Sequence, residues 1–244
     1  MGGGKILAAV CVLAAGAARA GGRPSLTVAA AANVRPALEE IREAFERRTG
    51  TRVTASYGAS GILARQIEQG APFDVFLSAD ARFLASPSID ASTREPFAVG
   101  NLVLVTARGR PALDSVTGLA GPAFARIAVA KPEIAPYGRA AMEALSRSGV
   151  LPAIRARLVF AESVRDALRY VETGDADAGF AAESEARETA LARRAVAPEL
   201  YAPIVQEAAI VARSSRRKEA AAFLEFLRGP EAGAIWARYG YRRP

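Results

Sequence analysis

Four loops of this chain share a pattern that suits anion binding: a short apolar run ends in small or hydroxyl residues that open directly into an expected helix. The runs and loops are Leu26–Ala32 into Asn33–Pro36, Arg52–Tyr57 into Gly58–Gly61, Ile127–Ala130 into Pro136–Gly138, and Leu158–Phe160 into Glu162–Val164. The start of a helix has unpaired N–H groups and carries roughly half a positive charge. Several helix starts that point at one spot can hold an anion without Lys or Arg. The pattern therefore predicts a site for a small oxyanion.

Two candidate ligand contacts lie in the first half of the chain. Asn33 precedes Pro36 by three residues, which fits an ordinary helix N-cap with proline in the first turn. Alternatively, the Asn33 amide points outward and donates to a ligand oxygen. Ser60 lies in the segment Tyr57–Gly61, whose small residues allow backbone N–H groups to approach a ligand closely. Many strand-to-helix loops look like this, so Ser60 alone is a weak signal.

Two further candidates lie in the second half. Tyr137 stands between Pro136 and Gly138 at an expected helix start, where it acts as a lid whose hydroxyl donates to a ligand or as surface packing. Val164 offers only its backbone N–H, with Glu162 and Ser163 as candidate helix caps. None of the four positions is convincing alone.

Composition excludes several other kinds of site. The chain has no histidine and one cysteine, Cys11, so Ser-His and Cys-His catalysis and His-based metal sites are excluded. The net charge of +7 comes from arginines scattered among glutamates, as in Glu39–Glu43. A nucleic-acid surface needs clustered basic residues with interleaved aromatic ones, so we expect no nucleic-acid partner.

Residues 1–20 read as a cleavable signal peptide. Lys5 precedes the apolar stretch Ile6–Ala18, and Ala18-Arg19-Ala20 fits a small-x-small cleavage site. A lipoprotein signal would use Cys11, but the preceding Ala8-Ala9-Val10 match that signal poorly. No later window is long and apolar enough for a membrane span. We therefore expect an exported protein located in the periplasm.

After the signal, expected strands and helices alternate, which predicts an α/β fold with mostly parallel sheets. The expected strands are Leu26–Ala32, Arg52–Tyr57, Asp74–Ser78, Gly100–Thr106, Ile127–Ala130, Leu158–Phe160, Ala178–Ala182 and Glu207–Ala212. The expected helices are Pro36–Arg48, Ile62–Gln69, Ala81–Leu84, Arg139–Ser148, Val164–Glu172, Arg217–Leu227 and Glu231–Tyr239. If there are two lobes, Asn101–Thr106 and Glu207–Ala212 are the candidate crossing strands. In open α/β sheets, ligands bind beyond the carboxyl ends of the strands, where all four loops fall.

From Leu26 to Tyr241 the chain resembles the periplasmic molybdate-binding proteins of ABC importers. The resemblance is carried by Leu63–Asp80, Gly100–Val103, Glu162–Leu168, Gly229–Ala232 and Arg238–Tyr241. It implies a two-lobed, type II-like binding-protein fold: residues 21–102 and 206–244 form lobe I, and residues 103–205 form lobe II. It also implies an inner-membrane ABC permease as partner, a monomer, no cofactor and no enzymatic activity.

The resemblance places molybdate or tungstate between the lobes, held by neutral donors at Asn33, Ser60, Tyr137 and Val164, with no direct protein ligand to the metal. Two positions depart from the family pattern. Asn33 stands where many members have Ser, and Ala182 stands where many have a binding Tyr, whose hydroxyl Tyr137 replaces from another loop.

The protonation state of the proposed ligand fits a site made of neutral hydrogen-bond donors. Molybdate, tungstate and sulfate are fully deprotonated near neutral pH, whereas phosphate needs an acceptor for its proton, and no Asp or Glu is among the proposed contacts. Sulfate or another tetrahedral oxyanion remains the alternative, because cavity size separates these ions. A secreted serine hydrolase and the sensing domain of a transcription regulator are remote alternatives. The interpretation requires the four residues to line one cavity without a buried carboxylate among them.

Overall fold

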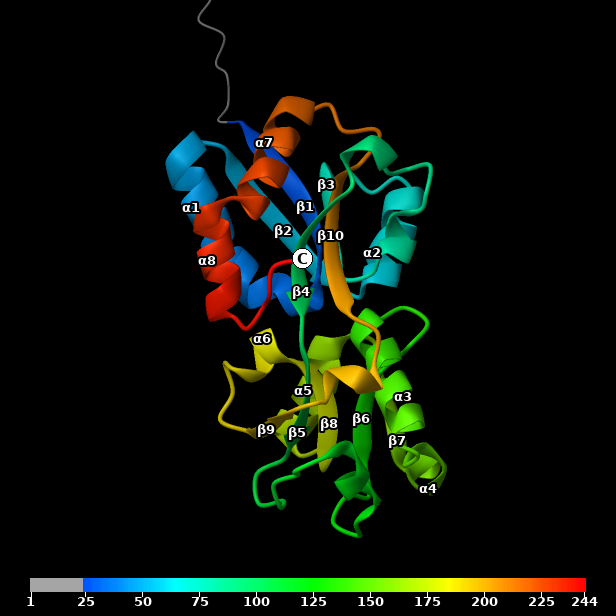
Figure 1. Cartoon of the computed structure of the whole chain (residues 1–244). Helices are drawn as coiled ribbons and strands as arrows, with labels where there is room; N and C mark the ends of the chain where they lie inside the picture. The colour runs from blue at the N-terminus through cyan, green and yellow to red at the C-terminus, as the bar shows by residue number, and fades with distance from the viewer. Residues whose placement is uncertain (1–23) are drawn as a thin grey trace, which may run out of the picture.

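The computed structural model describes residues 24–244, so the expected signal peptide lies outside the described residues. This part of the chain forms two α/β lobes, one above the other in Figure 1, each built on a five-stranded sheet. Within residues 24–244, no helix is long and apolar enough to cross a membrane.

The first sheet has the strand order β2-β1-β3-β10-β4. Its strands are β1 (Ser25–Ala31), β2 (Arg52–Gly58), β3 (Val75–Ser78), β4 (Glu95–Gly100) and β10 (Ile204–Ile210). β1 pairs in parallel with β2 and β3, whereas β10 is antiparallel to both β3 and β4. Four strands therefore run in one direction and β10 alone is reversed.

The second sheet repeats this plan with the order β7-β6-β8-β5-β9. Its strands are β5 (Leu102–Thr106), β6 (Ile127–Ala130), β7 (Leu158–Ala161), β8 (Ala178–Ala182) and β9 (Ala192–Ala195). β6 is parallel to β7 and β8, and β5 is antiparallel to β8 and β9. The expected two-lobed fold with mostly parallel strands is confirmed, with one reversed strand in each sheet.

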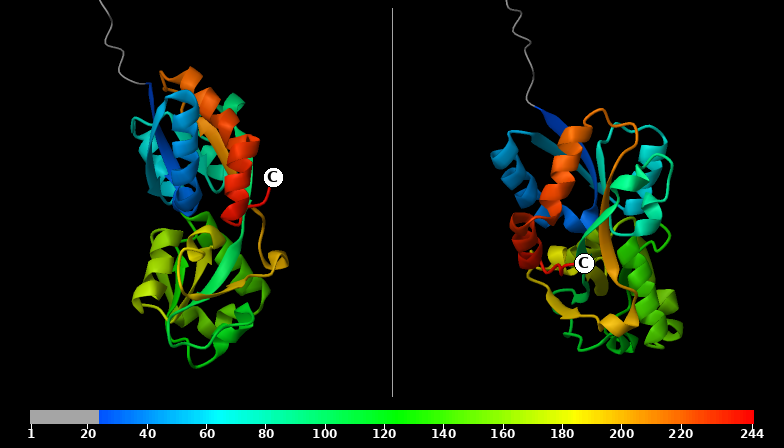
Figure 2. Two further views of the ribbon diagram at one scale, coloured as in Figure 1. Left: turned by 90° about the vertical axis from the view of Figure 1, so that its left-hand side faces the viewer. Right: turned by 45° about the horizontal axis from the view of Figure 1, so that its top comes forward.

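Helices cover both faces of each sheet. In the first lobe, α1 (Arg35–Thr49), α7 (Arg217–Arg228) and α8 (Pro230–Arg238) pack on one face, and α2 (Ser60–Glu68) packs on the other. In the second lobe, α3 (Pro136–Arg147) and α4 (Leu151–Ile154) share one core cluster, whereas α5 (Val164–Thr173) and α6 (Glu183–Ala186) pack on the opposite face. Figure 2 shows these layers from two further sides.

Two chain crossings join the lobes. The first passes from β4 to β5 at Asn101, and the second leads from the second lobe into β10 through residues 201–203. The two crossings touch, because the backbone N–H of Leu102 donates to the Tyr201 hydroxyl at 3.2 Å.

The expectation of one continuous strand over Gly100–Thr106 is wrong. The chain leaves the first sheet after Gly100 and enters the second at Leu102, so the apolar run belongs to two sheets. Asn101 belongs to neither sheet. Its side-chain Nδ2 donates to Glu183 Oε2 at 3.0 Å and to the Gly240 carbonyl at 2.8 Å, and these hydrogen bonds hold it between the two sheets. The chain therefore passes from the first sheet to the second at Asn101, the first residue of the expected crossing strand Asn101–Thr106.

Candidate functional site

One small cavity lies between the lobes, and all four residues singled out from the sequence line it. Its lining consists of Ala31, Ala32, Asn33, Gly58, Ala59, Ser60, Ala135, Pro136, Tyr137 and Val164. The stretches around residues 33 and 60 belong to the first lobe, and those around residues 137 and 164 belong to the second. The structure thus brings together loops that are up to 131 residues apart in sequence, from Asn33 to Val164.

Three α-helices and one 3-10 turn begin at this cavity. α2 begins at Ser60, α3 at Pro136 and α5 at Val164, while α1 follows a 3-10 turn that contains Asn33. The first N–H groups of each helix lack partners within that helix, and the helix dipoles place positive potential there. Among the described residues that line it, none is Lys, Arg, Asp or Glu. The cavity therefore has the donors and the potential for an anion without a formal charge.

Ser60 is fully buried at the first position of α2. Its Oγ accepts a hydrogen bond from the Ala79 N–H at 3.2 Å. A serine hydroxyl has one hydrogen and two acceptor lone pairs, so this bond leaves the Ser60 hydrogen available. Ser60 is thus held in place and can donate into the cavity.

Asn33 differs from its expected local role. The N-cap of α1 is Val34, with Pro36 in the first turn as expected, and Asn33 lies in the 3-10 turn Ala32–Val34. The N-cap interpretation is therefore wrong, because the extra turn places Asn33 before the helix start. Its side-chain Nδ2 donates to Gln206 Oε1 and to the Tyr241 hydroxyl, each at 2.9 Å.

Both hydrogens of the Asn33 side-chain amide are thus donated to groups of the protein. A ligand at this position would therefore bind the backbone N–H groups of the 3-10 turn, and the side-chain amide could bind it only after giving up one of these hydrogen bonds. A ligand contact at Asn33 stays a prediction.

Tyr137 is buried with its hydroxyl against the first interlobe crossing. A Cβ atom added at Gly100 would lie 2.0 Å from this hydroxyl, so the glycine makes room for it. Burial raises the pKa of Tyr137 well above its ordinary value, and the hydroxyl keeps its proton at neutral pH. Tyr137 can therefore donate but carries no charge. Ala182, where the resemblance predicts a Tyr, belongs to the same core cluster as Tyr137.

At the fourth position, Val164 begins α5 and Ser163 is the N-cap, with its Oγ accepting from the Asp166 N–H at 3.1 Å. Of the two candidate caps, Ser163 is correct. Glu162 is exposed and pairs with Lys131 Nζ at 2.7 Å. The glutamate thus points away from the cavity, and the backbone of Val164 remains at its wall.

A family model for bacterial extracellular solute-binding proteins matches residues 26–242. The chain belongs to this family. It is 36% identical to the molybdate-binding protein of Azotobacter vinelandii over 222 residues, covering 88% of each chain. It is 37% identical to that of Rhodobacter capsulatus (87% of this chain and 86% of the relative) and 34% identical to that of Escherichia coli K12 (88% of each).

Solved structures agree with these relatives. The solute-binding protein superposes on the A. vinelandii periplasmic molybdate-binding protein with a TM-score of 0.82 at 35% identity, covering 90% of this chain and 99% of that one. A sulfate-binding protein of Mycobacterium tuberculosis matches with a TM-score of 0.74 at 21% identity, covering 90% and 87%. The second match shows the fold alone, whereas the first confirms the family resemblance read from the sequence.

A buried polar network supports the cavity of this solute-binding protein from behind. The Tyr241 hydroxyl and Ser184 Oγ both lie 2.7 Å from the Asn33 carbonyl oxygen, and Gln206 Nε2 donates to the Ile204 carbonyl at 3.1 Å. Ser184 belongs to the second lobe, so its bond to Asn33 crosses between the lobes. Sequence reasoning missed Gln206, Ser184 and Tyr241 as supports, although Tyr241 closes the motif Arg238–Tyr241.

Two buried carboxylates, Asp80 and Glu185, lie near the cavity without lining it, and Asp80 is paired with Arg139. Glu185 on α6 is 2% exposed, and neither of its side-chain oxygens has a hydrogen-bond partner among the described residues. Burial raises the pKa of Glu185 to about 8, against a smaller lowering by Arg165. Glu185 is therefore mostly neutral at pH 7 and does not repel an anion. The condition that no buried carboxylate stands among the four candidate contacts is met.

Proposed function

We propose that this protein is an extracytoplasmic binding protein that captures molybdate, and tungstate with it, between its two lobes and delivers the anion to an ABC permease. The observation that carries the proposal is the cavity itself, where three α-helices and one 3-10 turn begin and none of the described lining residues is charged. The relatives named as molybdate-binding proteins support the choice of guest.

The donor set explains the ligand class. Ser60 and Tyr137 donate from hydroxyl groups, and the loops at Asn33 and Val164 donate from backbone N–H groups. A fully deprotonated dianion needs only hydrogen-bond donors from the protein. Hydrogen phosphate also carries an O–H group, which would find no acceptor in this site, and burying an unpaired O–H costs binding free energy. Sulfate has the same charge and shape but is smaller, so a cavity fitted to molybdate lengthens several of its hydrogen bonds at once.

Capture follows from the position of the cavity. An anion that touches loops of both lobes makes its full set of contacts only when the lobes are closed, so binding shifts the population toward the closed state. The closed form then presents surfaces of both lobes to the permease. No side chain at the cavity is arranged as a nucleophile with a base, and we propose no catalytic activity.

Titration calorimetry of the mature chain with molybdate, tungstate, sulfate and phosphate tests the proposal. We expect molybdate and tungstate to bind tightly, sulfate to bind more weakly and phosphate not to bind. Native mass spectrometry of the purified protein identifies any anion retained from the cell. Tighter binding of sulfate than of molybdate contradicts the proposed ligand while leaving the oxyanion site intact.

A further inference from the structure

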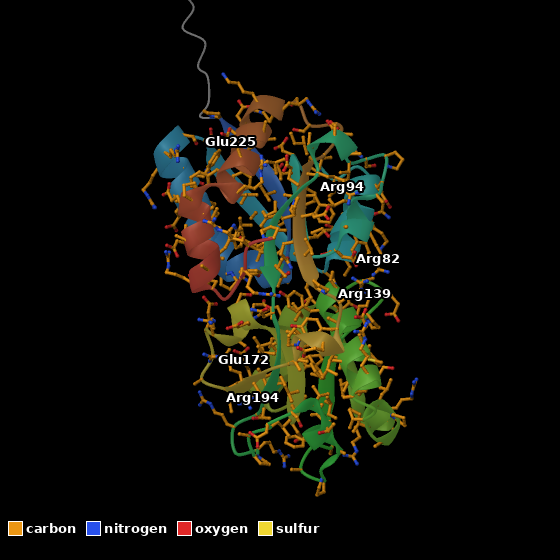
Figure 3. All side chains as sticks on the ribbon, viewed as in Figure 1. Arg82, Arg94, Arg139, Glu172, Arg194 and Glu225 are labelled. Atoms are coloured by element: carbon orange, nitrogen blue, oxygen red, sulfur yellow. The ribbon has the colours of Figure 1, made fainter. Side chains whose placement is uncertain are left out.

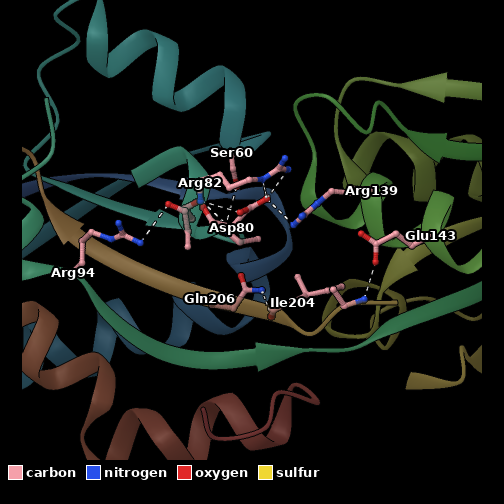
Figure 4. A network of polar contacts seen from close by, with 12 residues as sticks. Ser60, Asp80, Arg82, Arg94, Arg139, Glu143, Ile204 and Gln206 are labelled. Atoms are coloured by element: carbon pink, nitrogen blue, oxygen red, sulfur yellow. Dashed lines mark hydrogen bonds and ion pairs between the residues drawn. The ribbon is translucent and has the colours of Figure 1, made fainter. Parts of the chain in front are cut away.

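An ion pair spans the gap between the lobes at the edge of the anion cavity. Arg139 on α3 of the second lobe donates from Nη2 to Asp80 Oδ2 of the first lobe at 2.7 Å. The Asp80 side chain is 5% exposed and that of Arg139 is 36% exposed. Arg139 lies at the boundary between the lobes in Figure 3, and Figure 4 shows the contact. The two charges meet only while the lobes are together.

Both partners are tied to residues that line the cavity. Asp80 follows Ala79, whose N–H holds Ser60 Oγ, and Arg139 lies two residues after Tyr137. The ion pair therefore joins the Ser60 side of the site to the Tyr137 side.

The backbones of the two lobes also touch at this edge. The Gly61 N–H donates to the Ile134 carbonyl at 2.9 Å, and a Cβ atom at Gly61 would lie 2.9 Å from Ile134 Cα. A close approach of this kind requires glycine. The Asp80–Arg139 pair thus lies beside a tight interlobe contact rather than across open solvent.

We infer that Asp80 and Arg139 are positioning residues that form an interlobe latch, which slows release of the bound oxyanion. Neither Asp80 nor Arg139 lines the anion cavity. It stabilises the closed arrangement in which Ser60 and Tyr137 face the same guest. This inference rests on the proposed function, because release is measured on a bound oxyanion.

Arg82 provides a matched control within the same cluster. Its Nε and Nη2 both lie 2.9 Å from Asp80 Oδ2, but Arg82 belongs to the first lobe and its side chain is 59% exposed. Arg82→Gln and Arg139→Gln remove the same charge from the same carboxylate, and only the second change breaks a contact between lobes. The backbone N–H of Arg82 donates to Asp80 Oδ1 at 2.9 Å. Asp80→Asn keeps a side-chain oxygen that can accept this hydrogen bond.

Stopped-flow mixing with molybdate, combined with calorimetric Kd values, gives the association and release rates of each protein. The only tryptophan, Trp236, provides the signal: its ring lies 5.2 Å from that of Tyr241, whose hydroxyl lies 3.1 Å from Ser184 of the other lobe. We expect Arg139→Gln and Asp80→Asn to release molybdate about three- to tenfold faster, as suits a partly exposed ion pair. Arg82→Gln should release it at the wild-type rate.

Salt provides a second readout. Raising the ionic strength screens a partly exposed pair, so release from the wild type should accelerate while release from Arg139→Gln changes less. The latch is refuted if Arg139→Gln releases molybdate at the wild-type rate, if Arg82→Gln is accelerated equally, or if only association slows. If the wild type binds none of the four oxyanions, the proposed function fails and the latch fails with it.

Discussion

At the scale of single residues, the site depends on neutral donors held in fixed positions. The Ser60 hydroxyl accepts from Ala79, and the Tyr137 hydroxyl lies in space left by Gly100. Fixed dipoles in a buried cavity interact with an anion more strongly than the same dipoles in water. No Lys or Arg is among the described residues that line the cavity, so the anion can leave without breaking an ion pair with a buried cation.

Removing either hydroxyl should weaken anion binding without unfolding the protein. We expect Ser60→Ala and Tyr137→Phe each to cost about 1–3 kcal/mol of binding free energy, the range for a hydrogen bond to a charged acceptor. Calorimetry with molybdate measures the loss. Ser215→Ala and Tyr170→Phe are matched controls, since neither residue lines the cavity. Unchanged affinity in both test variants would place the ligand elsewhere.

Gly100 provides a second residue-level test. A methyl group at this position would lie 2.0 Å from the Tyr137 hydroxyl and 3.2 Å from Gln206 Nε2, so Gly100→Ala should displace Tyr137 and weaken molybdate binding. In a Tyr137→Phe background part of the clash is already removed, and the cost of Gly100→Ala should fall. A double-mutant cycle by calorimetry measures this coupling, which we expect to be about 0.5–3 kcal/mol. Additive effects would show that Gly100 does not act through the hydroxyl.

At the scale of elements, the sequence predicted most of the fold because its central strands, such as β3, β6 and β8, are short apolar runs buried on both faces. Ala178–Ala182 and Ile127–Ala130 agree with the structure to the residue, and α7 begins at Arg217 as expected. Other elements carry too little local signal. β4 contains a proline and β9 is Ala-Arg-Arg-Ala with every residue exposed, so neither resembles a buried strand. Both are edge strands, where such residues are tolerated.

The site was predictable only in part for the same reason. Helix starts and small residues are local features, so the four loops could be read from the sequence. The partners of Asn33 are not local: Gln206 and Tyr241 lie 173 and 208 residues away. No spacing rule connects them, and the N-cap interpretation of Asn33 failed because a 3-10 turn precedes α1.

The short helix α6 carries a testable pH dependence through Glu185. The folded-state pKa of about 8 exceeds the ordinary value of 4.5, so the folded protein keeps a proton that the unfolded chain releases. Folding stability is therefore lost as the pH rises from about 4.5 to about 8, and the loss is constant above that window. Glu185→Gln should be more stable than the wild type at pH 8, on the order of a few kcal/mol, and the difference should shrink toward pH 5.

Urea unfolding at several pH values measures this difference. Glu199→Gln, a change at an exposed glutamate outside α6, serves as the control. A stability difference between Glu185→Gln and the wild type that does not vary with pH would show that Glu185 is not neutralised by folding.

At the scale of the whole molecule, the two lobes share apolar contacts at the cavity. One core cluster includes Ala31, Ala59 and Ala79 of the first lobe together with Tyr137 and Val164 of the second. The three alanines each bury little area, so their part of the apolar contact favours closure only modestly. The interlobe hydrogen bonds and the bound anion provide the rest of the free energy that favours the closed state.

An anion that bridges the lobes should stabilise both of them in a single step. At a free molybdate concentration 100 times the Kd, linkage adds about 2.7 kcal/mol to the free energy of unfolding. Scanning calorimetry should therefore show a higher midpoint and one transition for the loaded protein, even if the free lobes unfold separately. Ser60→Ala should lose much of this shift at the same molybdate concentration, since its affinity is lower. If molybdate raised the midpoint of only one of two resolved transitions, the guest would contact a single lobe, and capture by closure would have to be abandoned.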